Sequence, residues 1–385
     1  MNPEVRSLFD LDLTGKRALV RVDFNIPIVD GRVTDDFRIK ACLPTIKYLL
    51  KGGASIALIS HLGRPIEGKF EEKYSLRPVA EVLSNLLETK IGFETNWING
   101  LDWGETRITL CENVRFLKGE SSNSPDLSKR IAALCDVYVN DAFATAHRAH
   151  ASTAGAVSLV DESCAGPLLI AEIKALDRII NKTKKPIVAV VGGSKVSTKI
   201  DLLENLALKT DHLIVGGGIA NSLLKARGTY VGNSLVEEKS EETAKRLIQD
   251  HPNIILPEDV VCAKTFSKSA SGKAKAIDAI EEDDQILDFG PNSLKQMSDL
   301  ISSAETIIWN GPVGVFEFKN FETGTRTIGE SIANSKAYSV AGGGDTVAAI
   351  NKFKLRSKIS YVSTAGGAFL EYLEGRNLPA LMPLL

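Results

Sequence analysis

Cationic side chains follow the apolar runs in the first half of this sequence. Arginine and histidine stand at the ends of stretches rich in valine, isoleucine and leucine, namely ALVRVDFN (18–25), IALISHLGR (56–64), ITLCENVRF (108–116) and VYVNDAFATAHRAH (137–150). Guanidinium groups bind carboxylates and phosphates through paired hydrogen bonds. This half of the chain is therefore predicted to hold a small polyanion.

Glycines take the same place in the second half. They close the apolar runs of IVAVVGGSKVSTK (187–199), LIVGGG (213–218), IIWNGPVGVFE (307–317), YSVAGGGDT (338–346) and ISYVSTAGG (359–367). One glycine run after a strand often makes only a tight turn. Here Lys195 and Lys199 follow one run, and Asp345 and Thr346 follow another, which adds groups suited to phosphate and magnesium. Because glycine lets backbone N–H groups approach phosphate closely, this half is predicted to bind the phosphate chain of a nucleotide.

The arginines and histidines also have a structural interpretation. A lone arginine is usually a solvated or salt-bridged surface residue. That description fits Arg38, which opens a predicted helix after two aspartates, while Arg21 lies inside its strand and is predicted to be a structural ion-pair partner. No further ligand cluster accompanies His61, His147 and His150, so hydrogen-bonding roles are predicted for them in preference to a metal site.

The segments between the apolar runs have helical periodicity. Helices are predicted over 38–51, 75–90, 200–210 and 238–250. The strands are almost wholly apolar, as in parallel sheets covered on both faces, and their alternation with helices predicts a doubly wound α/β fold. Ligands bind such sheets beyond the carboxyl ends of the strands, which is where every motif above is placed.

The chain is predicted to form two such Rossmann-like domains with a cleft between them. A helix over 168–183, ended by Lys184-Lys185-Pro186, connects a first domain, residues 1–167, to a second, residues 184–365. The tail 371–385 is predicted to join the first domain, because its apolar last ten residues would otherwise be exposed. Movement at the connecting helix is expected to close the cleft and exclude water.

Composition excludes several classes of protein. With 44% hydrophobic and 24% charged residues, the 385-residue chain is expected to be globular, and its net charge of −2 leaves no basic excess for nucleic-acid binding. No secretory signal is visible, and no apolar run approaches the ~18 residues that span a bilayer, so no membrane partner is expected. Five scattered cysteines without a CxxC pair are expected to be buried reduced thiols of a cytoplasmic protein.

The familiar signatures of other catalysts are missing. The sequence contains no GxxxxGK[ST], no GxGxxG that opens a helix ahead of an acidic residue, no protein-kinase motifs and no GxSxG elbow. Phosphoryl transfer fits this inventory, because it needs mainly positioning and charge neutralisation. Two alternatives are a non-catalytic two-domain solute receptor, which the lysine–glycine–aspartate set disfavours, and a Rossmann oxidoreductase, which the missing fingerprint disfavours.

Taken together, these motifs resemble phosphoglycerate kinase. The likeness runs in order from near residue 10 to the C-terminus through VRVDFN (20–25), DDFRI (35–39), HLGRP (61–65), ENVRF (112–116), VNDAFATAHRAHAST (139–153), AGPLL (165–169), VVGGSKVSTK (190–199), IVGGGIAN (214–221), WNGPVGVFE (309–317), AGGGDT (341–346) and STAGGAFLEYLEG (363–375). The resemblance implies reversible transfer of the 1-phosphate of 1,3-bisphosphoglycerate to MgADP, which yields 3-phosphoglycerate and MgATP. Since both substrate sets lie within one chain, a monomer is sufficient.

The resemblance also implies the residues of both sites. For the phosphoglycerate they are Asp23, Phe24, Asn25, Arg38, His61, Leu62, Gly63, Arg64, Arg115 and Arg148. For the nucleotide they are Gly193, Lys195, Lys199, Gly217, Asn310, Val315, Glu317, Gly343, Gly344, Asp345 and Thr346. Arg38 and Lys199 would act on the transferring group together with the amides of Gly366 and Gly367, and Asp345 would hold Mg²⁺.

Three positions bear on how these implied sites work. Ala365 stands where the family usually has glycine, and alanine adopts left-handed backbone poorly, so the amide geometry at Gly366 and Gly367 is expected to depend on it. Phe37 precedes Arg38 where a small polar residue is common, and Pro291 lies near the expected adenine pocket.

Overall fold

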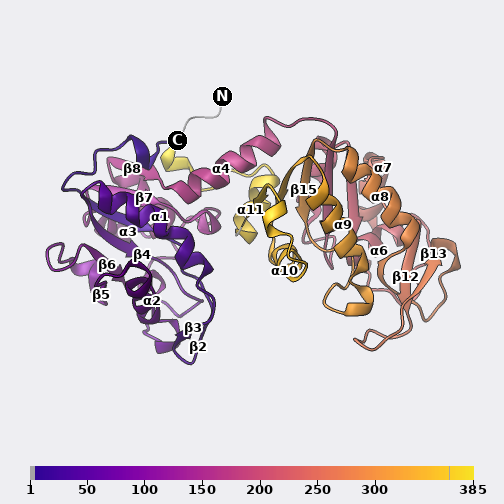
Figure 1. The fold of residues 1–385 in the computed structure, drawn as a ribbon, viewed down its shortest axis with the longest axis horizontal. Helices are drawn as coiled ribbons and strands as arrows, with labels where there is room; N and C mark the ends of the chain where they lie inside the picture. The colour runs from indigo at the N-terminus through magenta and orange to yellow at the C-terminus, as the bar shows by residue number, and fades with distance from the viewer. Residues whose placement is uncertain (1–4, 364) are drawn as a thin grey trace. The chain divides into compact units, whose positions relative to one another are not determined.

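The computed structural model describes residues 5–363 and 365–385, and the chain divides into two compact units. Unit 1 consists of the chain up to Lys174 together with Asn377–Leu385, and unit 2 consists of Ala175–Arg376. Figure 1 follows the chain by colour through both units. Within unit 1, the C-terminal tail returns beside the segment that follows the fifth strand of the sheet, where Ala380 N donates to Ala146 O (3.0 Å). Leu378, Ala380, Leu381 and Leu384 of the tail are buried, whereas Met382 and Leu385 are about half exposed.

A six-stranded parallel sheet forms the centre of unit 1. Its order is β5-β6-β4-β1-β7-β8. The strands are β1 (Arg17–Arg21), β4 (Ser55–Ile59), β5 (Gly92–Glu94), β6 (Ile108–Cys111), β7 (Val137–Asn140) and β8 (Glu162–Ala165). The chain proceeds outward from β1 through β4 and later returns to β7 on the other side of β1. Ligands bind at such a reversal, so the carboxyl ends of β1 and β7 mark the expected site.

Unit 1 contains four α-helices or parts of α-helices among its described residues, and local sequence features explain the limits of the second and the beginning of the fourth. The helices are α1 (Phe37–Lys51), α2 (Arg77–Leu87), α3 (Pro125–Ala132) and the first part of α4 (Pro167–Ile180), and a small hairpin of β2 (Ile28–Val29) and β3 (Arg32–Val33) precedes α1. Helix α2 is shorter than the predicted 75–90, because Pro78 marks its first turn and Glu88 ends it with a left-handed φ of 51°. Helix α4 begins where the carboxylate of Asp141 accepts from Leu168 N (2.8 Å) and Leu169 N (3.0 Å).

Unit 2 contains a second six-stranded parallel sheet, in the order β11-β10-β9-β15-β16-β17. The strands are β9 (Ile187–Gly192), β10 (His212–Gly216), β11 (Ile254–Ile255), β15 (Thr306–Asn310), β16 (Tyr338–Ala341) and β17 (Tyr361–Val362). This order has its reversal between β9 and β15, as in doubly wound nucleotide-binding sheets. The prediction of two parallel-sheet α/β domains is confirmed. A further antiparallel sheet, not predicted, comprises β12 (Asp259–Ala263), β13 (Lys273–Ala276) and β14 (Gln285–Phe289).

The helices of unit 2 are α5 (Ile200–Lys209), α6 (Gly217–Ala226), α7 (Glu241–Asp250), α8 (Pro291–Ser303), α9 (Thr323–Asn334), α10 (Gly344–Lys352) and α11 (Gly366–Leu373). Several of them, namely α5, α6, α10 and α11, follow strands whose ends carry glycine. The predicted helix 238–250 is divided into a 3₁₀ turn, Glu238–Ser240, and α7. Pro291 is the first residue of α8, where a missing N–H costs no helical hydrogen bond. In the described ranges, no helix has both the length and the apolar character needed to cross a membrane.

Candidate active site

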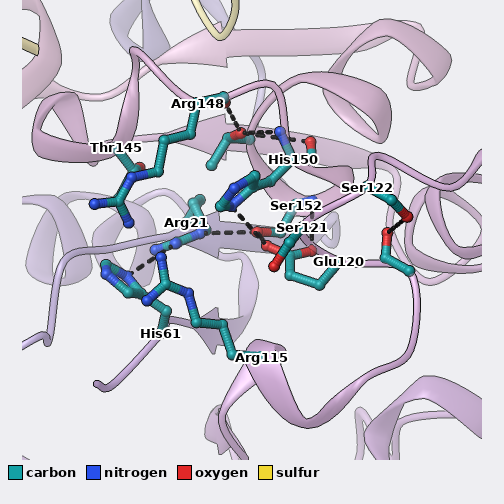
Figure 2. Close-up of polar contacts among 12 residues, drawn as sticks. Arg21, His61, Arg115, Glu120, Ser121, Ser122, Thr145, Arg148, His150 and Ser152 are labelled. Carbon is teal, nitrogen blue, oxygen red and sulfur yellow. Dashed lines mark hydrogen bonds and ion pairs between the residues drawn. The ribbon is translucent and has the colours of Figure 1, made fainter. Parts of the chain in front are cut away.

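The predicted cationic residues of unit 1 gather at the carboxyl ends of its central strands. His61 follows β4, Arg115 follows β6 and Arg148 follows β7. Figure 2 shows these three side chains converging around Arg21. Burial lowers the pKa of His61 well below its usual value, and the positive charges of Arg21, Arg115, Arg148 and Arg38 lower it further. The side chains form one basic cluster, whose field favours a bound anion.

The guanidinium of Arg115 likewise lies among other cations, and its pKa is lowered. Burial lowers its pKa to about 10, and the charges of Arg148, Arg21 and Arg64 act in the same direction. Its Nη1 donates to the carbonyl of Gly63 in the loop after β4. Arg64 itself is exposed in that loop. A bound anion would relieve the repulsion among these guanidinium groups.

Arg38 lies on α1, beside the loop that follows β1. Its Nη1 donates to Asp23 Oδ2 (2.7 Å) and to Asn25 O (3.0 Å). Asn25 Oδ1 accepts from Gly63 N (3.0 Å), which joins the loops after β1 and β4. The structure thus brings the predicted glycerate-binding residues together with Arg38.

Phe24 and Leu62 occupy the same loops but face inward. The Phe24 side chain is fully buried, and its N–H donates to Ser60 Oγ (2.8 Å). The Leu62 side chain is buried too, and its N–H donates to Asn113 Oδ1 (3.2 Å). These two residues shape the loops through packing, so a substrate would meet their main-chain atoms.

Asn113 is a buried residue that sequence reasoning left without a role. Its Nδ2 donates to Leu62 O (2.8 Å) and Tyr74 O (2.9 Å), and its Oδ1 also accepts from Arg115 N (3.0 Å). One amide therefore holds the loop after β4 against the turn that carries Arg115. The only sequence signal is an asparagine at the end of an apolar run.

The prediction for Arg21 requires a correction. Among the residues that the structure describes, its guanidinium makes no direct ion pair: it donates to Ser152 Oγ (3.1 Å), to Val22 O (2.5 Å) and to His61 Nδ1 (3.2 Å). It reaches the carboxylate of Glu120 only through Ser152. The sequence could not show this, because Ser152 and Glu120 come from two other loops of unit 1.

The two histidines of the HxxH segment lie beside different partners. His147 Nε2 accepts from Arg148 Nε (3.3 Å), which confirms the hydrogen-bonding role predicted for His147. His150 Nδ1 lies 3.8 Å from Glu120 Oε1, and burial together with Arg115 and Arg148 lowers the pKa of His150 to about 4. His150 therefore belongs to the basic cluster as a neutral ring.

In unit 2, Lys199 joins the ends of the two strands at the reversal of the sheet. Its ammonium donates to Gly192 O (2.6 Å), Asn310 Oδ1 (2.6 Å) and Asn310 O (3.2 Å). Burial lowers its pKa to about 8, while the negative charge of Asp345 acts in the opposite direction. Asn310 Nδ2 donates to Gly342 O (2.7 Å), which brings in the end of β16. A cation is thus held where three glycine-rich strand ends meet.

Helix α10 begins next to this cation. Gly343 is its N-cap, with a φ of 100° that favours glycine. Thr346 is buried in its first turn, and its Oγ1 accepts from Gly311 N (2.7 Å). Asp345 is exposed there. One carboxylate plus substrate phosphates is a common way to bind Mg²⁺, so this residue fits a metal held jointly with a nucleotide.

A pocket of about 640 Å³ opens beside the same strand ends of unit 2. The predicted residues Gly217, Val315 and Glu317 line it. Its other walls, which sequence reasoning missed, are largely apolar and include Leu235, Phe266, Leu287, Phe289 and Val313. Gly217 has a φ of 67°, and a Cβ there would lie 2.7 Å from Gly193 O. An apolar pocket beside glycine amides suits a nucleoside whose phosphates extend toward Lys199. Lys195 is exposed on the loop after β9.

The structure shows the backbone at Ala365 and the exposure of Phe37, the two positions beside the implied catalytic groups that differ from the usual family residue. Ala365 is the N-cap of α11 with φ −100° and ψ 93°, an extended backbone that alanine adopts without strain. The missing glycine therefore imposes no backbone penalty on the amides of Gly366 and Gly367, which open the helix. Phe37 is the first residue of α1 and is 43% exposed.

A doubly wound sheet with a glycine-lined pocket, together with a second parallel sheet that ends in a basic cluster, is the architecture of a two-domain phosphotransferase. The phosphoglycerate kinase family profile matches residues 8–376. A curated phosphoglycerate kinase from Francisella philomiragia is 52% identical over 379 residues, covering 97% of each chain, and one from Vibrio campbellii is 51% identical over 377 residues, covering 98% of this chain and 97% of the relative.

Solved structures agree with the sequence relatives. The structure of phosphoglycerate kinase from Coxiella burnetii has a TM-score of 0.95 at 50% identity and 99% coverage of both chains. That of the Pyrococcus horikoshii enzyme has a TM-score of 0.82 at 30% identity and 98% coverage of both. The chain belongs to the phosphoglycerate kinase family. It is a phosphotransferase of glycolysis, which removes the solute receptor and the oxidoreductase as alternatives.

Proposed function

We propose that this chain binds 3-phosphoglycerate at the basic cluster of unit 1 and MgATP or MgADP in the pocket of unit 2. The observation that carries the proposal is the basic cluster: arginine and histidine side chains meet at the carboxyl ends of the strands of one sheet, where their positive charges lower the pKa of His61 and of Arg115. Such a site holds a compact ligand that carries several negative charges.

On the phosphoglycerate side, the phosphate is bound by His61, Arg64, Arg115 and Arg148. The hydroxyl and carboxylate of glycerate lie against Asp23 and Asn25. Arg38 then leaves Asp23 in part and turns its guanidinium toward the phosphoryl group in transfer, because half-buried Arg38 is the cation next to the glycerate-binding loop. A charge that is placed where negative charge develops lowers the barrier of the reaction.

On the nucleotide side, the adenosine occupies the apolar pocket and Glu317 contacts the ribose. The phosphates extend along the amides of Gly343 and Gly344, where the helix N-terminus favours anions. Lys199 accompanies the transferring group, and Lys195 contacts nucleotide phosphate. Asp345 holds Mg²⁺, which neutralises phosphate charge when it is bound. The amides of Gly366 and Gly367 at the start of α11 assist the transition state.

Direct transfer requires the two substrates to meet, and closure at the connecting segment 168–183 is proposed to achieve this. The domains are proposed to be 1–167 with 371–385 and 184–365. The enzyme is proposed to act as a cytoplasmic monomer, since one chain carries both sets of residues. Scattering profiles that are identical with and without both substrates would contradict closure.

The proposal is tested by a coupled assay. The protein is supplied with 3-phosphoglycerate and MgATP, and glyceraldehyde-3-phosphate dehydrogenase reports the product through loss of NADH. Turnover that requires Mg²⁺ and that falls in the Arg115→Ala variant through a higher KM for 3-phosphoglycerate alone supports the assignment. If Arg115→Ala leaves that KM unchanged, the basic cluster is not the binding site.

A further inference from the structure

A buried carboxylate lies beneath the basic cluster, and the proposed function assigns it no role. Glu120 is completely inaccessible to solvent. Its Oε1 accepts from Ser152 Oγ (2.5 Å), and its Oε2 accepts from Ser152 N (3.0 Å). Its carbonyl also accepts from Ala151 N (2.9 Å). Glu120 therefore holds, by side chain and main chain, the segment that follows Arg148 (Figure 2).

The hydrogen bonds continue from Glu120 to a predicted ligand of the phosphate. Ser152 Oγ accepts from Arg21 Nε (3.1 Å). The same guanidinium donates from Nη2 to His61 Nδ1 (3.2 Å). Since Arg21 and Ser152 are fully buried and His61 is nearly so, these bonds are shielded from competing water. An unbroken path thus links Glu120, through Ser152 and Arg21, to His61.

The direction of the last bond determines where His61 carries its proton. A guanidinium has donors only, so Nδ1 of His61 must be the acceptor and the neutral ring carries its proton on Nε2. We propose that Glu120 is a positioning residue for phosphoglycerate binding: through Ser152 and Arg21, it fixes His61 in the neutral tautomer that donates from Nε2. The contribution of Glu120 to phosphoglycerate binding rests on the proposed function, whereas the assignment of the His61 tautomer does not.

The carboxylate is needed in this place, not merely a side chain of its shape. Ser152 donates twice, from N–H and O–H, and the two oxygens of Glu120 accept both bonds. A glutamine offers one oxygen and one NH₂ group, so a donor would face a donor at one of the two positions. The negative charge of Glu120 also opposes the mutual repulsion of the guanidinium groups at Arg115. Loss of the charge therefore loosens Arg21 and frees the tautomer of His61.

The test uses Glu120→Gln and Ser152→Ala in the full-length enzyme, with Glu67→Gln as the matched control. Glu67 accepts from Gly119 N (2.8 Å) and Ser121 N (2.7 Å), the amides on either side of Glu120, so Glu67→Gln disturbs the same loop but leaves the carboxylate of Glu120 and its bonds to Ser152 in place. Nitrogen NMR of the substrate-free protein, labelled at histidine, reports the His61 tautomer, with His61→Gln used to assign the signal. Steady-state assays report KM for 3-phosphoglycerate and for MgATP.

We expect the relay variants, Glu120→Gln and Ser152→Ala, to replace the NMR signals of a single Nε2–H tautomer of His61 with those of a mixture of tautomers. We also expect them to raise KM for 3-phosphoglycerate about tenfold, equivalent to about 1.4 kcal/mol, with KM for MgATP unchanged. Glu67→Gln should leave both readouts as in the wild type. Ser152→Ala decides the matter if Glu120→Gln does not fold, because the smaller change keeps the main-chain bond to Glu120.

Two results would overturn the inference. One is an unchanged His61 spectrum in the relay variants. The other is an equal rise of both KM values with a lower Tm in all three variants, which is what a purely structural residue would produce. If the His61 spectrum changes while His61→Gln leaves KM for 3-phosphoglycerate unaltered, the positioning role stands and the proposed binding site fails.

Discussion

Replacing Lys199 by methionine tests the nucleotide half of the site, because this ammonium is partly buried and donates three hydrogen bonds. Its pKa of about 8, against 10.5 for an ordinary lysine, means that the folded protein disfavours the charged form. At 1.36 kcal/mol per pKa unit, the penalty is on the order of 3 kcal/mol at pH 7. Methionine removes this penalty, but it leaves Gly192 O and the two oxygens of Asn310 without their donor. The two effects oppose each other, so a change in Tm of only a few degrees is expected.

Catalysis should respond far more strongly than stability. Removal of one well-placed donor to developing charge costs about 10²–10³ in kcat. We therefore expect Lys199→Met to lower kcat by at least ~100-fold in the coupled assay, with a Tm close to that of the wild type. Lys195→Met is the matched control, since Lys195 is an exposed lysine of the same loop, and it should mainly weaken nucleotide binding. A Lys199→Met enzyme with near-normal kcat would refute the assigned role.

The same lysine predicts the pH dependence of nucleotide binding. Below about pH 8 the ammonium is already charged, and above that value the free enzyme loses the proton. Bound phosphate favours the ammonium, so binding above pH 8 must take up a proton and the affinity for MgADP must fall as pH rises. Titration calorimetry in two buffers of different ionisation enthalpy measures this uptake. It should be absent in Lys199→Met; the same uptake in both proteins would show that another group is responsible.

Four further substitutions test other parts of the structure. Arg38→Ala should lower kcat at least ~100-fold with an unchanged Tm, and near-normal turnover would remove Arg38 from the transition state. Asp345→Ala should raise the Mg²⁺ concentration needed for half-maximal activity, so an unaltered Mg²⁺ dependence would place the metal elsewhere. Burial raises the pKa of Asp288 to about 7. Its contribution to the free energy of unfolding is therefore present below the unfolded pKa near 4 and is lost as pH rises through 7. Denaturant titrations at several pH values should show this fall in the free energy of unfolding in the wild type and a smaller fall in Asp288→Asn. Gly217→Ala should destabilise the fold by about 1–2 kcal/mol through its positive φ alone, and an unchanged Tm with normal MgADP affinity would contradict the reported backbone there.

Much of the fold and many site positions were predictable from local sequence signals. Apolar runs that end in arginine or glycine mark both the strands and the end of each strand where a ligand is predicted to bind. Helical periodicity placed α1 and α5 within a residue of their observed limits, because burial of one helix face repeats along the chain. The prediction for α2 was too long at both ends, and more so at its C-terminal end, where Glu88 adopts a left-handed φ that the sequence does not indicate.

Side chains whose partners lie far away in sequence could not be predicted. Asn113 and Glu120 look like ordinary polar residues in ENVRFLKGE, yet each bonds loops that follow other strands. Arg21 was assigned the wrong kind of partner for the same reason. The backbone angles of Ala365 likewise depend on how α11 is held after β17, so the alanine alone could not show that the site tolerates it.

The sequence by itself determined which residue types stand at the strand ends, and hence the prediction that one domain binds a polyanion and the other a nucleotide. Only the tertiary structure decided the strand order, the pairing of β1 with β7, and the path from Glu120 to His61. The physical reason is that parallel pairing and buried hydrogen bonds join residues that are distant along the chain. Periodicity and capping act only over neighbouring turns, so they determine elements, whereas packing determines which elements meet.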